Sequence, residues 1–449
     1  MSSPDAVPEV SRSAIAARDA AWNFWWLVID GFVFSFGITF ISPSSILPVF
    51  VARLTPLDIL AGAVPAIDFV GLALPQLIGA RWAARAARAG GRKRFVLIVA
   101  TLGRIPMLAP IAATAIWGDR EPGIVLASLL IGLGLFRVSE GLVLPAYFDI
   151  VGAVVDPRRR ARYFALQQAS GAIGGVVSAF GARWLLAALP FPWGFVACFA
   201  LGTFFVTFVL VVFAQVREPP PDDVAWAEVA VAQSIDDQAH EAVGDALARP
   251  TWWRDVLALV TDDDGFRLLF AGRALAAVAS MAPAYYAVAA VRRLEATDAD
   301  GATFGAVMLG SALFGTLVWG EVAGRFRHPV LIPLGTALGA AAAVGASIAP
   351  DVTWLLGVFA AAGLGSSALG MADTALPLAL AERAQRSRAL YVAVYATLTV
   401  PFAVLSPLAG GILSGAYGYE AVNGVAVVAY CAAGVVGLRL MRLFPVQAR

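Results

Sequence analysis

The sequence predicts an all-helical (all-α) integral membrane protein whose twelve transmembrane helices form two six-helix bundles. Of the 449 residues, 60% are hydrophobic and only 14% are charged, whereas a soluble chain carries roughly a quarter charged residues. A helix that crosses a bilayer needs about 20 apolar residues, so twelve such helices fit this length with short loops between them. The sequence lacks the regularly alternating strands that predict a membrane barrel.

The apolar segments fall into two sets of six, separated by a polar stretch. The first set covers residues 22–50, 57–80, 95–117, 123–148, 163–188 and 194–215. The second set covers residues 266–291, 302–322, 329–349, 353–379, 389–415 and 420–441. The predicted organisation is therefore a first bundle over 22–215 and a second bundle over 266–441, with polar segments over 1–21, 216–265 and 442–449.

Basic residues predict the orientation of the chain. The loops after the second, fourth, eighth and tenth segments are rich in arginine, whereas the loops on the other side hold little besides Arg53, Arg120, Arg292 and Arg293. Arginine-rich short loops stay on the cytoplasmic side of a membrane. Both termini are therefore predicted to be cytoplasmic, in a multi-pass protein of the inner (plasma) membrane.

The region between the two sets is markedly acidic. Residues 217–264 hold 12 acidic and 3 basic side chains, which leaves 19 acidic and 29 basic residues elsewhere. Pro219-Pro220-Pro221 begins this region, and Trp252 to Leu257 predict a short amphipathic helix on the inner membrane surface. We interpret residues 216–265 as an acidic cytoplasmic linker between the bundles.

Simple counts exclude several classes of protein. Lys93 is the only lysine and no phosphate-binding loop surrounds it, so the chain is not itself an ATP-driven pump. His240 and His328 are the only histidines, and Cys198 and Cys431 stand singly in apolar runs. We expect no metal, no cofactor, no enzymatic activity and no nucleic acid partner.

Three segments carry a family resemblance. A glycine-led basic loop lies within residues 79–94, and a similar loop lies within residues 320–327. In the fourth apolar segment, residues 133–141, a leucine precedes Arg137 by four positions and Glu140 is followed by a glycine. These segments resemble the loop and helix-4 motifs of the major facilitator superfamily. The acidic residue usual in the loop motif is missing, and glutamate replaces the usual glutamine in the helix-4 motif.

The resemblance implies a fold and a function. It implies the fold of this superfamily, with a central cytoplasmic loop between the bundles, and a monomeric secondary active transporter of a small organic solute with the proton as coupling ion. Export by antiport is slightly favoured, although residues 171–178 lack the glycine-proline pair typical of drug antiporters. The alternatives are an uptake symporter or uniporter, and a non-transporting sensor or scaffold.

Three ionisable residues in the first bundle are the predicted proton-coupling group. A charged group at the bilayer centre costs roughly 3 kcal/mol on insertion scales, so such residues face a cavity or a partner. Asp30 in the first segment and Arg137 and Glu140 in the fourth are all near mid-depth. Arg137 keeps its proton and acts as a fixed charge, with Glu140 as its expected partner and Asp30 as the favoured proton carrier. An ion-pair lock between two helices is the alternative.

Other ionisable residues are predicted to have structural or gating roles. Asp68 and Arg104 are expected to pair with each other, and Arg183 belongs to the same layer. Asp149 precedes a basic loop, so it is either part of an intracellular gate or a screened surface charge.

The second bundle supplies the predicted substrate cavity. Arg273 is placed to meet an anionic substrate, with Asp373 as its pair. Tyr285 and Tyr286, next to Pro283, are candidate stacking surfaces for an organic solute, with helix packing as the alternative.

Overall fold

The computed structural model describes residues 9–88, 91–118, 120–218, 261–384 and 388–443. Within these ranges the regular structure is helical and contains no strand. Twelve spans in these ranges are long and apolar enough to cross a membrane. The predicted fold class is therefore confirmed, and the chain is a multi-pass membrane protein.

The first bundle is built from nine helices. These are α1 (Glu9–Thr39), α2 (Ile46–Leu54), α3 (Asp58–Ala73), α4 (Gln76–Arg88), α5 (Arg92–Arg104), α6 (Leu108–Trp117), α7 (Pro122–Val154), α8 (Arg160–Ala188) and α9 (Trp193–Ala214). A break at Leu74 and Pro75 separates α3 from α4, and a 3-10 turn at Ile105–Met107 separates α5 from α6. Each break contains a proline, which lacks a backbone N–H and crowds the preceding turn.

The last six spans are built from seven helices. These are α12 (Asp264–Ala279), α13 (Met281–Arg293), α14 (Asp298–Phe326), α15 (Leu331–Ser347), α16 (Val352–Arg383), α17 (Arg388–Tyr417) and α18 (Tyr419–Met441). The break between α12 and α13 falls at Ser280, just before Pro283, which cannot donate to the carbonyl four residues earlier. Thr297 and Asp300 form a capping box that fixes the start of α14.

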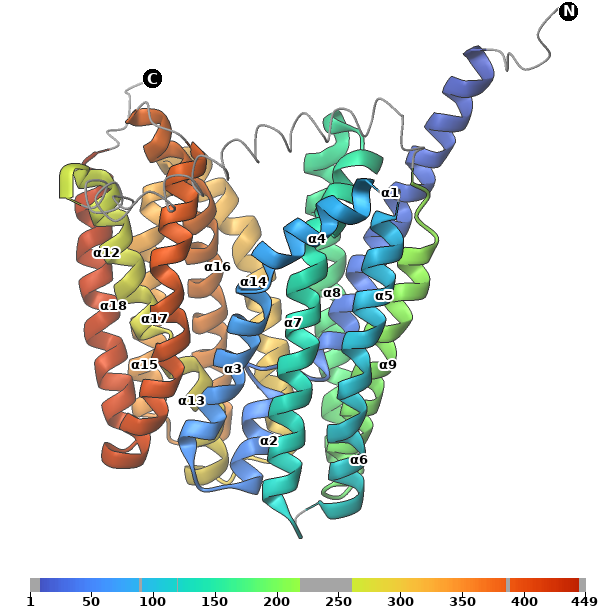
Figure 1. Ribbon diagram of the computed structural model, residues 1–449. Helices are drawn as coiled ribbons and strands as arrows, with labels where there is room; N and C mark the ends of the chain where they lie inside the picture. Colours follow the sequence, from blue (N-terminus) through green and yellow to red (C-terminus); the bar gives the residue numbers. More distant parts are fainter. Residues whose placement is uncertain (1–8, 89–90, 119, 219–260, 385–387, 444–449) are drawn as a thin grey trace, which may run out of the picture.

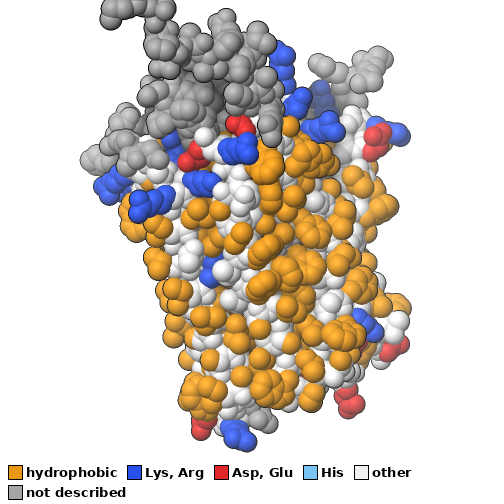
Figure 2. Space-filling view, turned by 90° about the vertical axis from the view of Figure 1, so that its right-hand side faces the viewer, with side chains coloured by type: hydrophobic (Ala, Val, Ile, Leu, Met, Phe, Trp, Pro, Cys, Tyr) orange, Lys and Arg blue, Asp and Glu red, His pale blue; other side chains and the backbone are white. Residues whose placement is uncertain are grey.

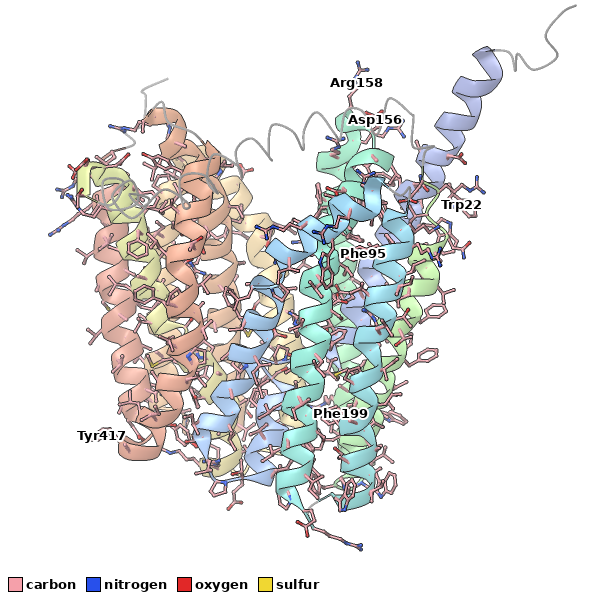
Figure 3. All side chains as sticks on the ribbon, viewed as in Figure 1. Trp22, Phe95, Asp156, Arg158, Phe199 and Tyr417 are labelled. Carbon is pink, nitrogen blue, oxygen red and sulfur yellow. The ribbon has the colours of Figure 1, made fainter. Side chains whose placement is uncertain are left out.

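The two bundles lie side by side and touch mainly at one end. In Figure 1, α1 begins and α18 ends at the upper end of the molecule. The bundles meet through α8 against α14 and α3 against α17. In Figure 3, Asp156 and Arg158 mark the upper end and Tyr417 the lower end. We call these the terminal end and the closed end.

The outer surface suits a lipid environment. Figure 2 shows a broad band of hydrophobic side chains over the middle of one face, with basic side chains gathered mostly at the upper end. Large apolar side chains such as Trp184 and Leu317 are 68% and 71% exposed. A wide apolar band bordered by charged ends is typical of a helical protein in a bilayer.

The first helix begins earlier than predicted, and one predicted helix lies where the structure describes no residues. Helix α1 already begins at Glu9, whereas the sequence separates residues 1–21 from the first bundle. The amphipathic helix predicted at Trp252 to Leu257 lies outside the described residues.

Candidate functional site

Helix α7 carries two charged residues that pair with different neighbouring helices. Arg137 pairs with Asp68 on α3 through Nε to Oδ1 at 2.7 Å, and its Nη2 donates to Oδ2 at 2.9 Å. Glu140 pairs with Arg104 on α5, with 2.7 Å between Oε1 and Nη1. Each side chain of these pairs is less than one-fifth exposed, so both pairs are interior contacts between helices.

The predicted pairings, Arg137 with Glu140 and Asp68 with Arg104, are wrong. Residues three apart on a helix differ by roughly 60° in direction. Helix α7 packs against α3 on one side and against α5 on another. A Cβ at Gly71 would lie 2.7 Å from the Cβ of Arg137, and one at Gly103 would lie 1.7 Å from Ser139 Oγ. These close approaches bring each charge on α7 to a separate partner.

Arg104 joins three helices. It is 5% exposed, its Nε donates to the carbonyl of Val206 on α9 at 2.9 Å, and its Nη1 donates to the carbonyl of Ala100 at 2.8 Å. Its guanidinium also lies 5.4 Å from the ring centre of Phe136. Together with the Glu140 pair, these contacts satisfy a buried cation. Arg104 thus pairs with Glu140 in place of the predicted Asp68, and its role as a structural or gating charge stays a prediction.

Asp30 lies in a separate cluster that joins α1, α7 and α8. It is 8% exposed, and Tyr147 donates a hydrogen bond to its Oδ2 at 3.0 Å. Tyr147 in turn accepts a hydrogen bond from Gln167 at 2.9 Å and lies 3.4 Å from the hydroxyl of Tyr163. Among the described residues, no basic side chain lies within ion-pair distance of Asp30.

The residues of the predicted proton-coupling group, Asp30, Arg137 and Glu140, are therefore not joined by direct contacts. Asp30 contacts Tyr147, which lies about two turns after Glu140 and nearly three turns after Arg137 on α7. Asp30 is thus a buried carboxyl group that has a hydrogen-bond donor but no direct counter-charge.

The second bundle contains one interior ion pair of the predicted kind. Arg273 on α12 and Asp373 on α16 are 3.1 Å apart, measured from Nε to Oδ2. Tyr395 on α17 donates to the other oxygen, Oδ1, at 2.6 Å. The side chains of Arg273 and Asp373 are 28% and 26% exposed, so this pair is more accessible than the two pairs of the first bundle.

Tyr285 and Tyr286 are packed side chains in this structure. Tyr285 is 1% exposed and donates to the carbonyl of Pro407 on α17. Tyr286 is 2% exposed and packs edge-to-face against Phe359, 6.0 Å between ring centres. Both border a small cavity of about 50 Å³ at the closed end. Their predicted place in a solute cavity stays a prediction.

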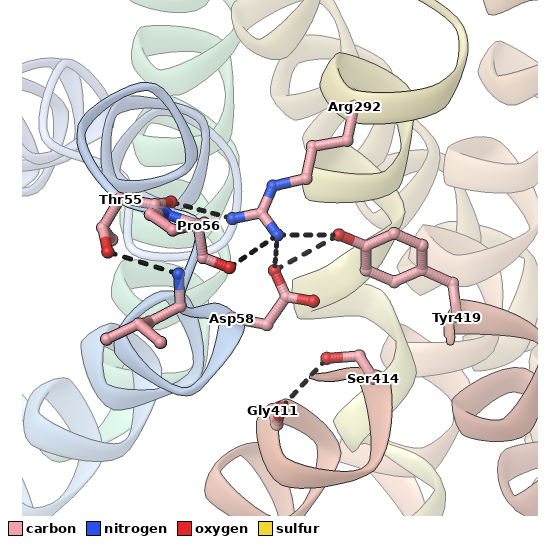
Figure 4. A network of polar contacts seen from close by, with 8 residues as sticks. Thr55, Pro56, Asp58, Arg292, Gly411, Ser414 and Tyr419 are labelled. Atoms are coloured by element: carbon pink, nitrogen blue, oxygen red, sulfur yellow. Dashed lines mark hydrogen bonds and ion pairs between the residues drawn. The ribbon is translucent and has the colours of Figure 1, made fainter. Parts of the chain in front are cut away.

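A network that sequence reasoning missed joins the two bundles at the closed end (Figure 4). Asp58 at the start of α3 is 6% exposed and forms an ion pair with Arg292 at the end of α13. Arg292 also donates to the carbonyls of Thr55 at 2.8 Å and Pro56 at 3.0 Å, and Tyr419 donates to Asp58 at 3.2 Å. We call Asp58, Arg292 and Tyr419 the bundle lock. The sequence signal was weak because Asp58 reads as an ordinary first-turn acidic residue.

Two further contacts cross between the bundles at the same end. Arg53 donates from Nε to Asp298 at 2.8 Å, and Arg183 on α8 donates to Thr303 on α14 at 2.6 Å. The predicted structural or gating residue Arg183 therefore contacts the second bundle, whereas Asp68 and Arg104 pair within the first bundle. Where both partners are described residues, every hydrogen bond and ion pair between the bundles lies at the closed end.

The terminal end has its own polar contacts within the first bundle. Asp149 lies 3.9 Å from Arg92, measured between Oδ2 and Nε. Lys93 donates to the carbonyls of Ala214 and Val216 at 2.6 Å each, which satisfies the last turn of α9. Burial raises the pKa of Glu218, which accepts a hydrogen bond from the backbone of Lys93. These contacts tie α5 to the end of α9.

Comparison with known proteins gives a likeness of fold. The sequence matches no protein-family model and no curated protein. The structure is similar to a D-xylose-proton symporter, with 15% identity over 91% of this chain and 96% of that chain and a TM-score of 0.63. It is also similar to a bacterial homologue of the human lysosomal transporter Spinster in an inward-facing conformation, with 15% identity, 95% and 98% coverage and a TM-score of 0.64. A major facilitator superfamily transporter in the outward conformation matches at 13% identity, 92% and 99% coverage and a TM-score of 0.58.

Proposed function

Because the chain has the fold of the major facilitator superfamily, we propose that it is a secondary active transporter that moves a small organic solute by alternating access. The observation that carries this proposal is the one-sided contact between the bundles. The bundle lock and the Arg53–Asp298 pair hold the bundles together at the closed end. Alternating access requires such contacts to break while new ones form at the terminal end.

The orientation of the chain assigns a direction to this state. The arginine-rich loops support a cytoplasmic position for the terminal end. The closed end then faces outward, and we assign this state as inward-facing. In this conformation a solute reaches the interior from the cytoplasm. We further propose that the protein lies in the inner membrane and works as a monomer.

Proton coupling is proposed to use Asp30. Arg137 is engaged by Asp68 through two oxygens, and Glu140 is engaged by Arg104, so each of these charges has a fixed partner. Among the residues that the structure describes, the Tyr147 hydroxyl is the one direct polar partner of Asp30, and that hydroxyl suits an ionised carboxylate. A carboxyl group without a counter-charge is the one whose proton is exchanged most easily when its access to water changes. Arg137 and Glu140 then act as fixed charges in the same bundle, each held by its own partner.

The proposal is tested in proteoliposomes. The wild-type protein is expected to couple solute flux to an imposed proton gradient. Asp30→Asn is expected to abolish solute-driven proton flux while solute exchange continues, because asparagine cannot bind or release the proton. Glu321→Gln, an exposed change on α14, is the matched control and should retain coupling. Coupled flux in Asp30→Asn would remove Asp30 from the mechanism.

The direction of coupling is read from the same assay. In export by antiport, which we slightly favour, the solute and the protons cross the membrane in opposite directions. In uptake by symport the solute and the protons cross in the same direction. The solute flux of a uniporter does not change when a proton gradient of either sign is imposed.

A further inference from the structure

Arg273 differs from the other arginines at membrane depth. Arg137 places two nitrogens on Asp68, and Arg104 has two backbone carbonyls in addition to its carboxylate. Within the described part of the chain, the contact of Arg273 Nε with Asp373 is the one polar contact that this guanidinium makes. A guanidinium has five N–H donors, so most of its hydrogen-bonding capacity is unused.

The position of Arg273 makes unused donors costly. Arg273 is nine residues from the start of α12, or roughly 14 Å at about 1.5 Å per residue. Asp373 is eight residues before Ala381, where its span ends, which gives a similar depth from the same end of the molecule. At such a depth a charged group needs partners. The side chain is 28% exposed, so a partner that is not part of the protein can reach it.

Asp373 and Tyr395 leave one edge of the guanidinium unused. Oδ2 of Asp373 faces Nε of Arg273, and Oδ1 accepts the hydrogen bond from Tyr395. Both carboxylate oxygens are thus engaged, and Asp373 is held in place from α17. The edge formed by Nη1 and Nη2 has two parallel donors, which match the two oxygens of a carboxylate.

Apolar rings lie next to this charged pair. Phe270 is one turn before Arg273 on α12, and Phe402 is two turns after Tyr395 on α17, so one ring shares a helix face with Arg273 and the other with the tyrosine that holds Asp373. The two rings contact each other at 6.1 Å and 70°. Both are partly exposed. An aromatic surface held by α12 and α17 therefore lies one helical turn from Arg273.

We propose that Arg273 binds the carboxylate of a monoanionic organic acid whose apolar body contacts Phe270 and Phe402. A monoanion is favoured over a phosphate dianion because the positive charge of Arg273 already faces Asp373. Within the described ranges, no second basic side chain forms an ion pair with Asp373, so a second negative charge on the ligand would lack a cation there. Asp373 and Tyr395 act as positioning residues for the guanidinium. The physiological meaning of this site rests on the proposed transport function, but binding itself does not.

The test measures binding by purified wild-type protein, without a flux assay. Benzoate and hexanoate are compared with their neutral analogues benzamide and hexanamide, and with phenyl phosphate as a dianion, by thermal shift and calorimetry. The two acids are expected to bind at least tenfold more tightly than the amides, because hydrogen bonds to a charged group are worth about 1.5–3 kcal/mol. Equal stabilisation by acids and amides overturns the proposal, as does tighter binding of phenyl phosphate than of benzoate.

Variants assign the binding to Arg273. Arg273→Gln should lower the affinity for benzoate about tenfold or more, and Arg273→Lys should retain part of it. Arg325→Gln, at a 71% exposed arginine, is the matched control and should bind like wild type. Unchanged benzoate binding in Arg273→Gln overturns the assignment. Acid binding with no solute flux would contradict the transporter proposal while leaving this site intact.

Discussion

Asp58→Asn tests whether the bundle lock holds the closed end together. Asp58 and Arg292 have side chains only 5% and 24% exposed, so removing one charge leaves the other partly buried without its partner. Breaking a buried ion pair costs roughly 3–5 kcal/mol. Arg292 keeps the carbonyls of Thr55 and Pro56 as acceptors, so we take the lower end of this range. A loss of about 3 kcal/mol changes the ratio of closed to open states at this end by roughly a hundredfold.

Spin labels across the closed end measure this ratio. Glu121 and Pro350 are exposed residues in loops of the first and second bundle. Each is changed to cysteine in a protein whose Cys198 and Cys431 have been replaced, so that the spin labels attach only at these two positions. Pulsed electron paramagnetic resonance should show one short distance with the lock intact. In Asp58→Asn a longer distance should become a major population.

A graded control separates the lock from general damage. Asp298→Asn removes the Arg53–Asp298 pair, whose arginine is 42% exposed. An exposed pair contributes about 0.2–1 kcal/mol, so this change should barely alter the distances. If Asp58→Asn gives the wild-type distance distribution, or if Asp298→Asn opens the closed end as much, the reasoning about the lock is refuted.

Two further predictions concern the stability of the first bundle. Lys93→Gln removes the ammonium group that donates to two carbonyls at the end of α9. Hydrogen bonds to charged groups are worth roughly 1.5–3 kcal/mol, so thermal unfolding should show a decrease of about 2 kcal/mol in the free energy of unfolding. An unchanged unfolding temperature would argue against this cap. Gly103→Ala would place a Cβ against Ser139 and should destabilise the protein by about 1–3 kcal/mol. The same change at Gly123, which has no atom within 4 Å of its added Cβ, should have little effect, and equal losses at both sites would contradict the packing argument.

The fold followed from the sequence because hydropathy acts segment by segment. The need to bury about 20 residues in hydrocarbon is local, so the apolar segments give the number of spans without knowledge of their packing. The interruptions within the helical spans also depend on local sequence, since Pro75, Pro106 and Pro283 each lie at or just after one of them.

The site was harder to predict because partners depend on packing. Arg137 and Glu140 share a broad face of α7, and nothing in their spacing indicates that α3 and α5 approach that face on different sides. The pairing of Arg273 with Asp373 was predictable because few other charges exist at that depth in the second bundle. The bundle lock was missed because Asp58 and Arg292 belong to different bundles and lie at helix ends, where charges are common.

The paired charges of the first bundle also determine how this bundle responds to voltage. Arg137 with Asp68 and Arg104 with Glu140 are neutral pairs, so moving them together through the membrane field carries no net charge. Among the described residues near mid-depth in this bundle, Asp30 is the carboxyl group that such a pair does not neutralise. One elementary charge moved across the membrane is worth about 2.3 kcal/mol per 100 mV. The membrane potential therefore acts on this bundle mainly through Asp30, and protonation of Asp30 makes its motion electrically silent.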